Sequence, residues 1–431
     1  MNKNPKTDKE LPVDDNLDIA LNKSLGHGID LFMKWLDGYG YAGYDLYDLW
    51  ATRYGKWAKG LYHEKKYLGT PFVVPVFFAD YVWPQLRKYV AKKKRYATAD
   101  AHYAFAFLTK YRMTGEKIWL EKVVELAEAM ESYVIEGYSG PCWGYPFDWQ
   151  TNRGLWPEGT PFITTTPYVY KVFAELADIT SDVKYADMCR GIANFALKDL
   201  NKRTLPNGTV STSYSPIDST TVVNANAYRA TILADAGTRF SDQKLLEEAR
   251  KNCRFILAAQ REDGAWLYDV TNPHDEFIDN FHTCIVLKNL IYTNSYLNLP
   301  EINKAVIRGY DFYLQNLMNK ELRPKPFYHV NRMQLVKQEM YDYAEGINLG
   351  ILLADRHPEA LKTAKRLGKW LLEDYQTPEG YFVTRELLFG IKMRFPTPRW
   401  TQSQLFASLC LLQSCVLKKS KTIKLNIAHT S

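Results

Sequence analysis

The sequence predicts an all-α protein in which six inner and about six outer helices close into a ring, an (α/α)6 toroid with aromatic-rich loops at one face. Turn-rich aromatic segments recur along the chain, and two kinds of helix alternate between them. Average helices run to about 11–12 residues and long ones to about 20, so a repeat near 60 fits two helices with their loops. The turn markers are Gly144, Gly208, Gly264, Pro324 and Gly380, at steps of 64, 56, 60 and 56 residues.

The first kind of helix is apolar on nearly every side, which predicts burial. Residues 347–354, Ile-Asn-Leu-Gly-Ile-Leu-Leu-Ala, are an example. Six such inner helices are expected, near 98–113, 163–178, 222–238, 277–293, 340–355 and 399–416.

The second kind of helix is charged and amphipathic. In the stretch 243–259, Leu246, Ala249, Cys253 and Ile256 recur at steps of 3, 4 and 3, with Lys and Glu between them. Five such outer helices are expected, near 117–134, 183–199, 243–259, 300–317 and 358–374.

The sixth inner helix ends without a partner, so we expect the helix near 16–36 to take the sixth outer place. The alternative is an open α-solenoid, which needs polar capping repeats at its ends. The apolar final helix argues against an exposed end. The expected division is a disordered tail at 1–15, one toroid domain at 16–417 and a basic tail at 418–431.

Composition favours an ordinary globular chain with an unusual share of aromatic residues. Of the 431 residues, 46% are hydrophobic and 24% charged, which excludes a disordered chain. The 11 Trp, 30 Tyr and 20 Phe suit a large core and also suit the faces of sugar rings.

Charge and targeting signals predict a cytoplasmic protein that neither binds nucleic acid nor spans a membrane. Lys+Arg minus Asp+Glu is 55 − 48 = +7, a mild excess that slightly favours an acidic substrate, and the basic run Lys92–Arg95 is interpreted as solvated. The polar N-terminus lacks a secretory signal, and the apolar stretches 72–78 and 405–417 are too short or too interrupted to cross a bilayer. The six cysteines include no C-x-x-C pair and are expected to be buried free thiols.

No cofactor or metal is expected. The sequence has no H-E-x-x-H, no clustered Cys and His, no phosphate-binding glycine loop and no G-x-S-x-G elbow.

Polar and aromatic residues gather where each inner helix begins, although a buried unpaired polar group costs about 1–3 kcal/mol. In a ring of parallel inner helices these starts lie on one face, so we expect them to meet in a central cleft walled by the aromatic turns. Asp279 and His282 share a helical face, and a carboxylate beside an imidazole suits acid–base work. Asp342 and Glu345 are spaced in the same way. Each group also has a structural interpretation, as a helix cap or an inert ion pair.

The candidate catalytic residues are Asp279, His282, Asp342, Tyr343, Glu345 and Asp148. The candidate substrate-binding residues are Trp143, Tyr145, Trp149, Arg153, Tyr214, Asn224, Asn226, Trp266, Arg399 and Gln402.

Five segments together resemble bacterial polysaccharide-biosynthesis proteins of the VpsJ type. They are Gly43–Asp48, Cys142–Gln150, Asp263–Trp266, Ile278–Thr283 and Arg399–Trp400. The resemblance implies an α/α toroid and a link to capsule, exopolysaccharide or O-antigen formation, and it brings no established reaction.

Two looser resemblances follow from the same turns. Gln260–Trp266 resembles the Q-x-x-D-G-x-W repeat of terpene cyclases and prenyltransferases, where it ties helix ends together. The chain lacks the D-x-D-D acid motif of those cyclases. The toroid also resembles glycoside hydrolases, uronate lyases and sugar epimerases, which is an analogy of fold.

The sequence therefore predicts a carbohydrate-active protein of polysaccharide biosynthesis or modification, with an oligosaccharide, a polysaccharide or a sugar precursor as its partner. As a hydrolase it would need two carboxyl groups across the cleft. As a lyase or epimerase it would use His282 with Tyr343, and Arg399 would hold a uronate carboxylate. The alternatives are a non-catalytic glycan-binding or assembly factor and a terpene-cyclase-like enzyme, which needs a mainly apolar cleft.

Overall fold

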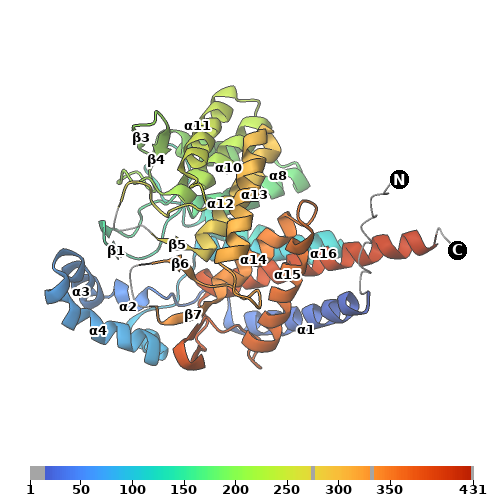
Figure 1. The fold of residues 1–431 in the computed structure, drawn as a ribbon, viewed down its shortest axis with the longest axis horizontal. Helices are drawn as coiled ribbons and strands as arrows, with labels where there is room; N and C mark the ends of the chain where they lie inside the picture. The colour runs from blue at the N-terminus through green and yellow to red at the C-terminus, as the bar shows by residue number, and fades with distance from the viewer. Residues whose placement is uncertain (1–14, 273–276, 331–333, 429–431) are drawn as a thin grey trace, which may run out of the picture.

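Figure 1 shows the fold of the computed structural model. Its inner helices form a closed ring, as the sequence predicts. The structure describes residues 15–272, 277–330 and 334–428. Each inner helix packs on the next, and the last packs on the first, which closes the ring. The inner helices are α6 (Ala97–Thr114), α8 (Thr166–Thr180), α10 (Val223–Arg239), α12 (Asn280–Leu297), α14 (Met340–Leu352) and α16 (Ser403–Ala428).

The predicted outer helices each cover the inner helix that precedes them in the chain. Apolar residues at helical spacing face inward, and lysines and glutamates face solvent. The outer helices are α7 (Lys117–Glu131), α9 (Val183–Lys198), α11 (Gln243–Ala259), α13 (Pro300–Asn316) and α15 (Pro358–Trp370), and a π-helical turn, η3 (Leu371–Tyr375), extends the last of them.

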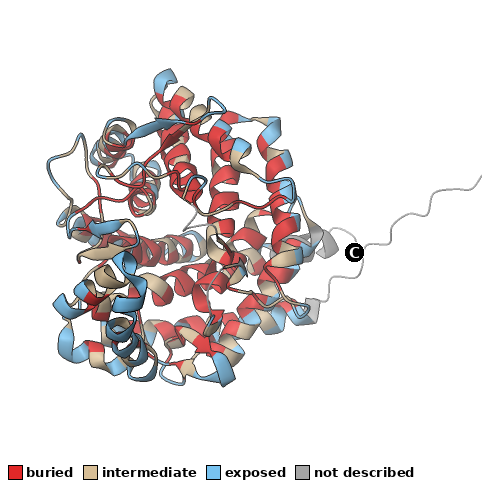
Figure 2. Cartoon of the chain, turned by 60° about the vertical axis from the view of Figure 1, so that its left-hand side comes forward, coloured by how far each residue is buried: buried red, intermediate tan, exposed pale blue. Residues whose placement is uncertain are grey.

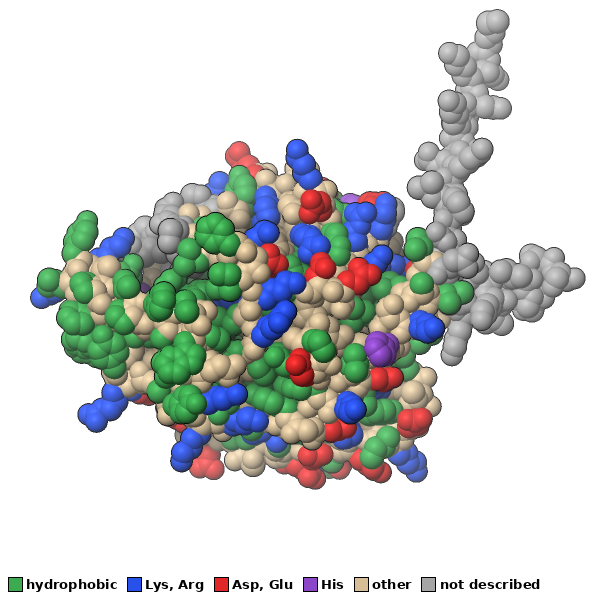
Figure 3. Space-filling view, turned by 90° about the horizontal axis from the view of Figure 1, so that it is seen from below, with side chains coloured by type: hydrophobic (Ala, Val, Ile, Leu, Met, Phe, Trp, Pro, Cys, Tyr) green, Lys and Arg blue, Asp and Glu red, His purple; other side chains and the backbone are tan. Residues whose placement is uncertain are grey.

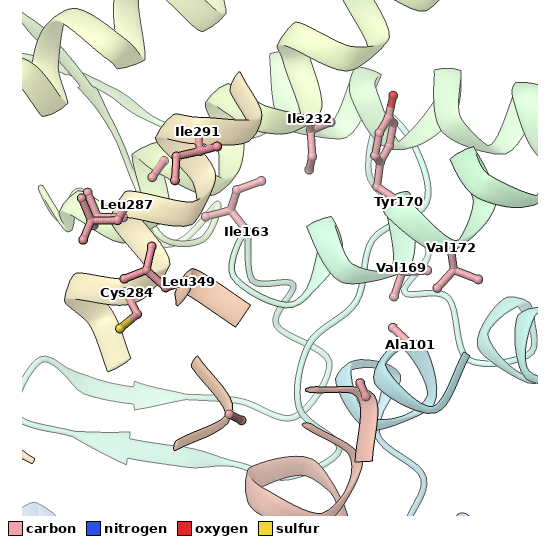
Figure 4. Packing of buried hydrophobic residues seen from close by; sticks show 14 of the residues in the cluster. Ala101, Ile163, Val169, Tyr170, Val172, Ile232, Cys284, Leu287, Ile291 and Leu349 are labelled. Carbon is pink, nitrogen blue, oxygen red and sulfur yellow. The ribbon is translucent and has the colours of Figure 1, made fainter. Parts of the chain in front are cut away.

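The hydrophobic core lies between and inside these helices (Figure 2). Figure 4 shows Val169 of α8, Ile232 of α10, Leu287 of α12 and Leu349 of α14, all of them buried. The inner helices are apolar all round because they contact both their ring neighbours and their outer partners, and removal of this surface from water is the main source of stability. All six cysteines are free, and five of them are buried.

The helix α1 (Asp15–Tyr39) occupies the sixth outer place, packed against α16. Two related turns contact α13 and α1 in the same way, so α1 takes the place of an outer helix such as α13. The amide of Gln260 donates to the Gly264 carbonyl (3.0 Å) and to Ala305 of α13 (2.9 Å). The amide of Gln376 donates in the same way to Gly380 (3.0 Å) and to Gly28 of α1 (2.7 Å). The turn from Gln260 therefore ties the C-terminal end of α11 to a carbonyl inside α13.

Replacement of Gln376 by Ala is expected to lower the free energy of unfolding by about 1–2 kcal/mol, because the Gly28 and Gly380 carbonyls lose their donor. Urea unfolding measures the change. The matched control is Gln243→Ala, at an exposed position, which is expected to shift stability by less than about 0.5 kcal/mol. Equal stability of the two variants would contradict the closing role of this turn.

Short antiparallel strands stiffen the loops that lead into the inner helices. β5 pairs with β6 directly before α12, and β7 pairs with β8 directly before α14. The strands are β1 (Trp149–Thr151), β2 (Gly154–Trp156), β3 (Lys202–Thr204), β4 (Val210–Thr212), β5 (Ile278–Asp279), β6 (Phe327–His329), β7 (Val336–Glu339), β8 (Arg385–Leu387) and β9 (Lys392–Met393). A 3-10 turn, η4 (Leu388–Gly390), joins the last two strands, and a π-helical turn, η5 (Pro398–Gln402), precedes α16.

A helical segment that the sequence did not predict joins α1 to α6 and projects from one end of the ring, at the left of Figure 1. The buried Arg87 fixes its base by donating to the Asp45 carbonyl (3.0 Å), to the Leu46 carbonyl (3.2 Å) and to the Asp80 carboxylate. The helices of this segment are α2 (Asp48–Ala51), α3 (Arg53–Glu64), α4 (Lys66–Val82), η1 (Pro84–Leu86) and α5 (Arg87–Val90).

The two predicted tails compare with the structure as follows: the N-terminal one falls almost entirely outside the described residues, and the C-terminal one falls largely within α16. Residues 1–14 lie outside the described part, and α16 continues through the segment expected as a basic tail as far as Ala428. Among the described residues, no helix is both apolar enough and long enough to pass through a bilayer.

Candidate active site

A cavity of about 540 Å³ opens where the inner helices begin. Every inner helix, with the turn that leads into it, contributes to the lining near its N-terminal end, so the polar helix starts do converge on one place. The contributing residues are Thr98, Thr164, Tyr168, Asn224, Tyr228, Phe281, His282, Ile285, Tyr341, Arg399, Trp400 and Gln404. The volume lies within the roughly 300–1,000 Å³ that is typical of small-ligand sites.

Aromatic rings form much of the cavity wall. Tyr145 and Trp149 stand at 5.4 Å between ring centroids on one side. On the other side Phe281 stacks on Tyr341 at 4.7 Å, and Trp400 meets Tyr341 edge-on at 5.1 Å. Such rings present flat apolar faces, and their polar tips can bond to hydroxyl groups.

Asp279 and His282 form a hydrogen-bonded pair at the wall. Asp279 ends β5 and is the N-cap residue of α12, and its Oδ2 lies 2.6 Å from Nδ1 of His282. The imidazole packs against Phe281 and Tyr268, with centroids 4.1 and 4.6 Å away, and its side chain keeps 20% exposure. A carboxylate at Nδ1 fixes the proton there and leaves Nε2 as the acceptor, which is the state of a general base.

Asp342 lies beside this pair, in an adjoining lobe of about 350 Å³ that Asp279 and His282 also line. Within the described residues, neither of its carboxylate oxygens accepts a hydrogen bond of ordinary geometry. Burial, followed by the nearby charges of Glu339 and Asp279, holds the pKa of Asp342 well above its usual range. Burial therefore favours the protonated form of this carboxyl group in the folded protein, which is the form that can donate a proton.

Three cationic residues near the site are held by carboxylates, and a fourth, Lys59 of the cavity lining, lies over the rings of Tyr47 and Trp50. Arg399 donates to both oxygens of Asp45 at 2.7 and 2.8 Å, and Arg385 donates to Glu339 at 2.6 Å. Lys288 pairs with the buried Glu345 at 2.5 Å. Arg399, expected to bind a substrate carboxylate, already has a bidentate partner from the chain itself.

The structure brings eight of the predicted site residues together. Six line the central cavity and two others line the adjoining lobe. His282, one of the six, also lines the lobe. They are Tyr145, Trp149, Tyr214, Asn224, His282 and Arg399 in the cavity, and Asp279 and Asp342 in the lobe. The Oδ1 atom of Asn224 has no hydrogen-bond partner among the described residues and is available to a ligand.

The other predicted site residues do not line the cavity. Four of them hold the fold by hydrogen bonds. Trp143 and Trp266 donate from Nε1 to the carbonyls of Met130 and Ile256, Asn226 receives the Thr212 amide, and Gln402 bonds both backbone groups of Phe382.

The remaining four are paired elsewhere. Tyr343 points into the core, where its hydroxyl donates to Gln338 (2.7 Å), and Glu345 pairs with Lys288. Asp148 lies at the surface in an ion pair with Lys56, and Arg153 donates to Asp269 (2.7 Å).

Several lining residues had no functional assignment from the sequence. Asp45 and Trp50 follow α1, Phe77 and Tyr81 belong to α4, and Arg385 lies in β8. The segment Gly43–Asp48 carried a signal, because it is one of the five segments of the resemblance. A lone arginine in a short strand carries none.

The buried Asp48, which accepts a hydrogen bond from the backbone of the cavity-lining Asp45, gives a pH-dependent prediction. Burial and the nearby Asp45 charge raise its pKa from 3.8 to about 7. Between these values the folded protein holds a proton that the unfolded chain releases, so the wild type loses stability as pH rises from about 4 to 7. Asp48→Asn is expected to remove this loss, worth about 1–2 kcal/mol between pH 5 and 7.5. Urea unfolding at both pH values measures it, and parallel pH profiles for the two proteins would contradict it.

In the described ranges, no group of three or more His, Cys, Asp or Glu side chains is placed to hold a metal ion.

The comparison with solved structures decides the fold. A cellobiose 2-epimerase from Bacillus thermoamylovorans matches with a TM-score of 0.59 at 12% identity, over 75% of this chain and 88% of that one. An unsaturated glucuronyl hydrolase specific for heparin matches with a TM-score of 0.59 at 10% identity, over 93% and 98%. A GH76 α-mannanase from Bacteroides thetaiotaomicron matches with a TM-score of 0.56 at 8% identity, over 75% and 87%.

The chain has the (α/α)6 toroid fold. No family model matches the sequence, and no curated protein matches it. At these identities the likeness extends to the toroid alone.

Proposed function

We propose that this toroid is an enzyme that acts on a neutral glycan by general acid–base catalysis in the central cavity. The proposal rests on one observation: three features lie close together. The cavity has aromatic walls, a His282–Asp279 pair with Nε2 directed away from the carboxylate, and beside it Asp342, whose burial raises its pKa. The three solved structures named above, all carbohydrate-active enzymes by their names, support the same class.

Charge pairing favours a neutral saccharide over a uronate. Arg399 and Arg385 are each bound to a carboxylate of the chain, so their charge is already balanced. Binding of a uronate carboxylate there would require one of these pairs to break, which leaves a buried charge uncompensated. This argument also disfavours a lyase, because β-elimination needs the uronate carboxylate to acidify the neighbouring carbon.

Residue roles follow from the proton positions. Nε2 of His282 takes a proton from water or from the substrate, and Asp279 stabilises the imidazolium that forms. Asp342 gives a proton to the leaving oxygen in a hydrolysis, or to the substrate carbon in an epimerisation. Tyr145, Trp149 and Trp400 hold the sugar by its faces.

A prenyl or terpene cyclase is disfavoured by the lining. Asp45, Asn224, His282, Arg399 and Gln404 place polar and charged groups around the cavity. A carbocation cascade requires a mainly apolar surface there.

The cellular role is part of the same proposal. The VpsJ-type resemblance supports a place in polysaccharide biosynthesis or modification. A cytoplasmic location is supported by the free cysteines, because thiols persist in a reducing compartment.

The test is incubation of the purified protein with a panel of neutral and uronate-containing oligosaccharides in deuterated water, followed by mass spectrometry and NMR. Hydrolysis yields shorter chains with no carbon-bound deuterium, and epimerisation yields an isomer that carries it. His282→Gln serves as the matched inactive control. Binding of a neutral oligosaccharide without turnover by the wild type would favour the non-catalytic alternative, and turnover of uronates alone would contradict the neutral substrate.

A further inference from the structure

The α3–α4 hairpin and the turns after it, residues 53–93, carry large hydrophobic side chains on their outer face. Tyr67 is 91% exposed, Phe78 63% and Val82 64%, and Trp57 and Trp83 are also more than half exposed. Figure 3 shows hydrophobic side chains crowded at the left-hand end of the molecule, where Figure 1 places α3 and α4. Scattered exposed apolar residues are normal, but a gathering of this kind marks an interaction surface.

The same segment holds the positive charge of the chain. Residues 53–93 contain 9 Lys and Arg against 2 acids, a net of +7, which equals the net charge of the whole chain, so the other residues sum to zero. One of the nine, Lys56, is paired with Asp148 outside the segment. Of the two acids, Asp80 is buried and paired with Arg87. Lys65, Lys66 and Lys88 are exposed beside the apolar side chains.

We propose that the α3–α4 hairpin docks on the surface of an anionic lipid bilayer. Phe78 and Val82 enter the boundary between headgroups and acyl chains, and Trp57 and Trp83 lie at headgroup level, where such rings are enriched. The lysines contact the lipid phosphates, and basic residues near a membrane surface add to apolar insertion.

Charge decides between a bilayer and a second copy of this chain. Two copies joined through this face would bring together two segments that each carry a net charge of +7, and like charges across an interface oppose association. An anionic lipid surface offers both the opposite charge and an apolar interior. The exposed apolar side chains also argue against nucleic-acid binding, because surfaces that bind nucleic acid are polar.

Docking brings the cavity next to the membrane. Phe77 and Tyr81 belong to the same helix α4, and they line the central cavity. The hairpin is thus both part of the cavity wall and the face toward the lipid. Membrane docking depends only on the side chains of this surface. Its test therefore needs no saccharide, and its outcome is separate from that of the proposed function.

The test is co-sedimentation of the full chain with vesicles of phosphatidylcholine, with and without phosphatidylglycerol. The wild type is expected to bind the anionic vesicles at low salt and to lose binding as salt rises. Phe78→Ser with Val82→Ser, and separately Lys65→Ser with Lys66→Ser, are expected to weaken binding by about 10-fold or more. The control is Ile118→Ser with Val183→Ser, two exposed apolar residues on the outer helices, which is expected to bind as the wild type does.

Thermal unfolding shows whether each variant keeps its fold, which is expected because the substituted side chains are exposed. Absence of wild-type binding to anionic vesicles would overturn the proposal. An equal loss in the control would overturn it as well. A wild-type dimer in light scattering that Phe78→Ser with Val82→Ser converts to a monomer would assign the face to a second copy instead.

Discussion

Replacement of His282 by Gln is expected to lower the turnover number on a neutral glycan by about 10²–10⁴-fold with little change in saccharide binding. The imidazole Nε2 is the proposed proton acceptor, and Gln keeps the size and polarity of the side chain without its basicity. Asp279→Asn is expected to act through the same atom, because an amide at Nδ1 no longer holds the required tautomer. Initial rates and calorimetric binding measure the two effects separately.

A double-substitution cycle tests whether the two residues work as one unit. The combined variant is expected to lose little more activity than His282→Gln alone, because groups that act through one proton transfer are strongly non-additive. His27→Gln, at an exposed position on α1, is the matched control and is expected to keep full activity. If the fold-loss of the double variant equals the product of the two single fold-losses, Asp279 has a role apart from His282.

Replacement of Asp342 by Asn is expected to lower activity by about 10²-fold or more and to raise stability. Burial raises the pKa of this carboxyl group in the folded protein above that of the unfolded chain. The wild type therefore loses stability as pH rises from about 4 toward the folded pKa, and the uncharged amide has no such loss. We therefore expect the variant to be more stable than the wild type at pH 7.5 and to gain little near pH 4.

Opposite signs for activity and stability distinguish a functional group from a packing residue. A residue that merely fills the core loses stability when it is changed, and its activity falls with the folded fraction. Urea unfolding at the two pH values and the rate at saturating substrate give the comparison. If the Asp342→Asn variant is less stable than the wild type but equally active, Asp342 is not the proton donor.

The ring could be predicted because its signals are periodic. The alternation of apolar and amphipathic helices repeats five times, and each pair of helices is joined by a marked turn. The place of α1 followed from the unpaired last helix, and the Gln376 bond to Gly28 confirms it. The meeting of the polar helix starts followed from the ring itself.

Single site residues were harder to predict, because a small shift along a helix changes the direction of a side chain. Tyr341 lines the cavity, whereas Tyr343, two residues on and about 200° around the helix, lies in the core. Arg399 reaches the cavity, but its bond to Asp45 depends on a contact between residues at opposite ends of the chain. No local pattern contains such a contact.

The α3–α4 hairpin escaped prediction for a different reason. Pro71 and Pro75 stand inside α4, and proline normally breaks a helix. Its residues are apolar on several faces, so no amphipathic period appears. The tight approach of Gly69 to the Tyr62 backbone, which leaves no room for a side chain, holds the two helices together, and such a contact is visible only in three dimensions.

The most direct test of the central claim is a crystal structure of the His282→Gln variant with a neutral oligosaccharide. The account predicts a sugar ring against Tyr145 and Trp149, with its reacting atoms within about 3.5 Å of both Asp342 and the side chain at position 282. A saccharide seated elsewhere on the toroid, or one in the cavity that neither residue can reach, would contradict it.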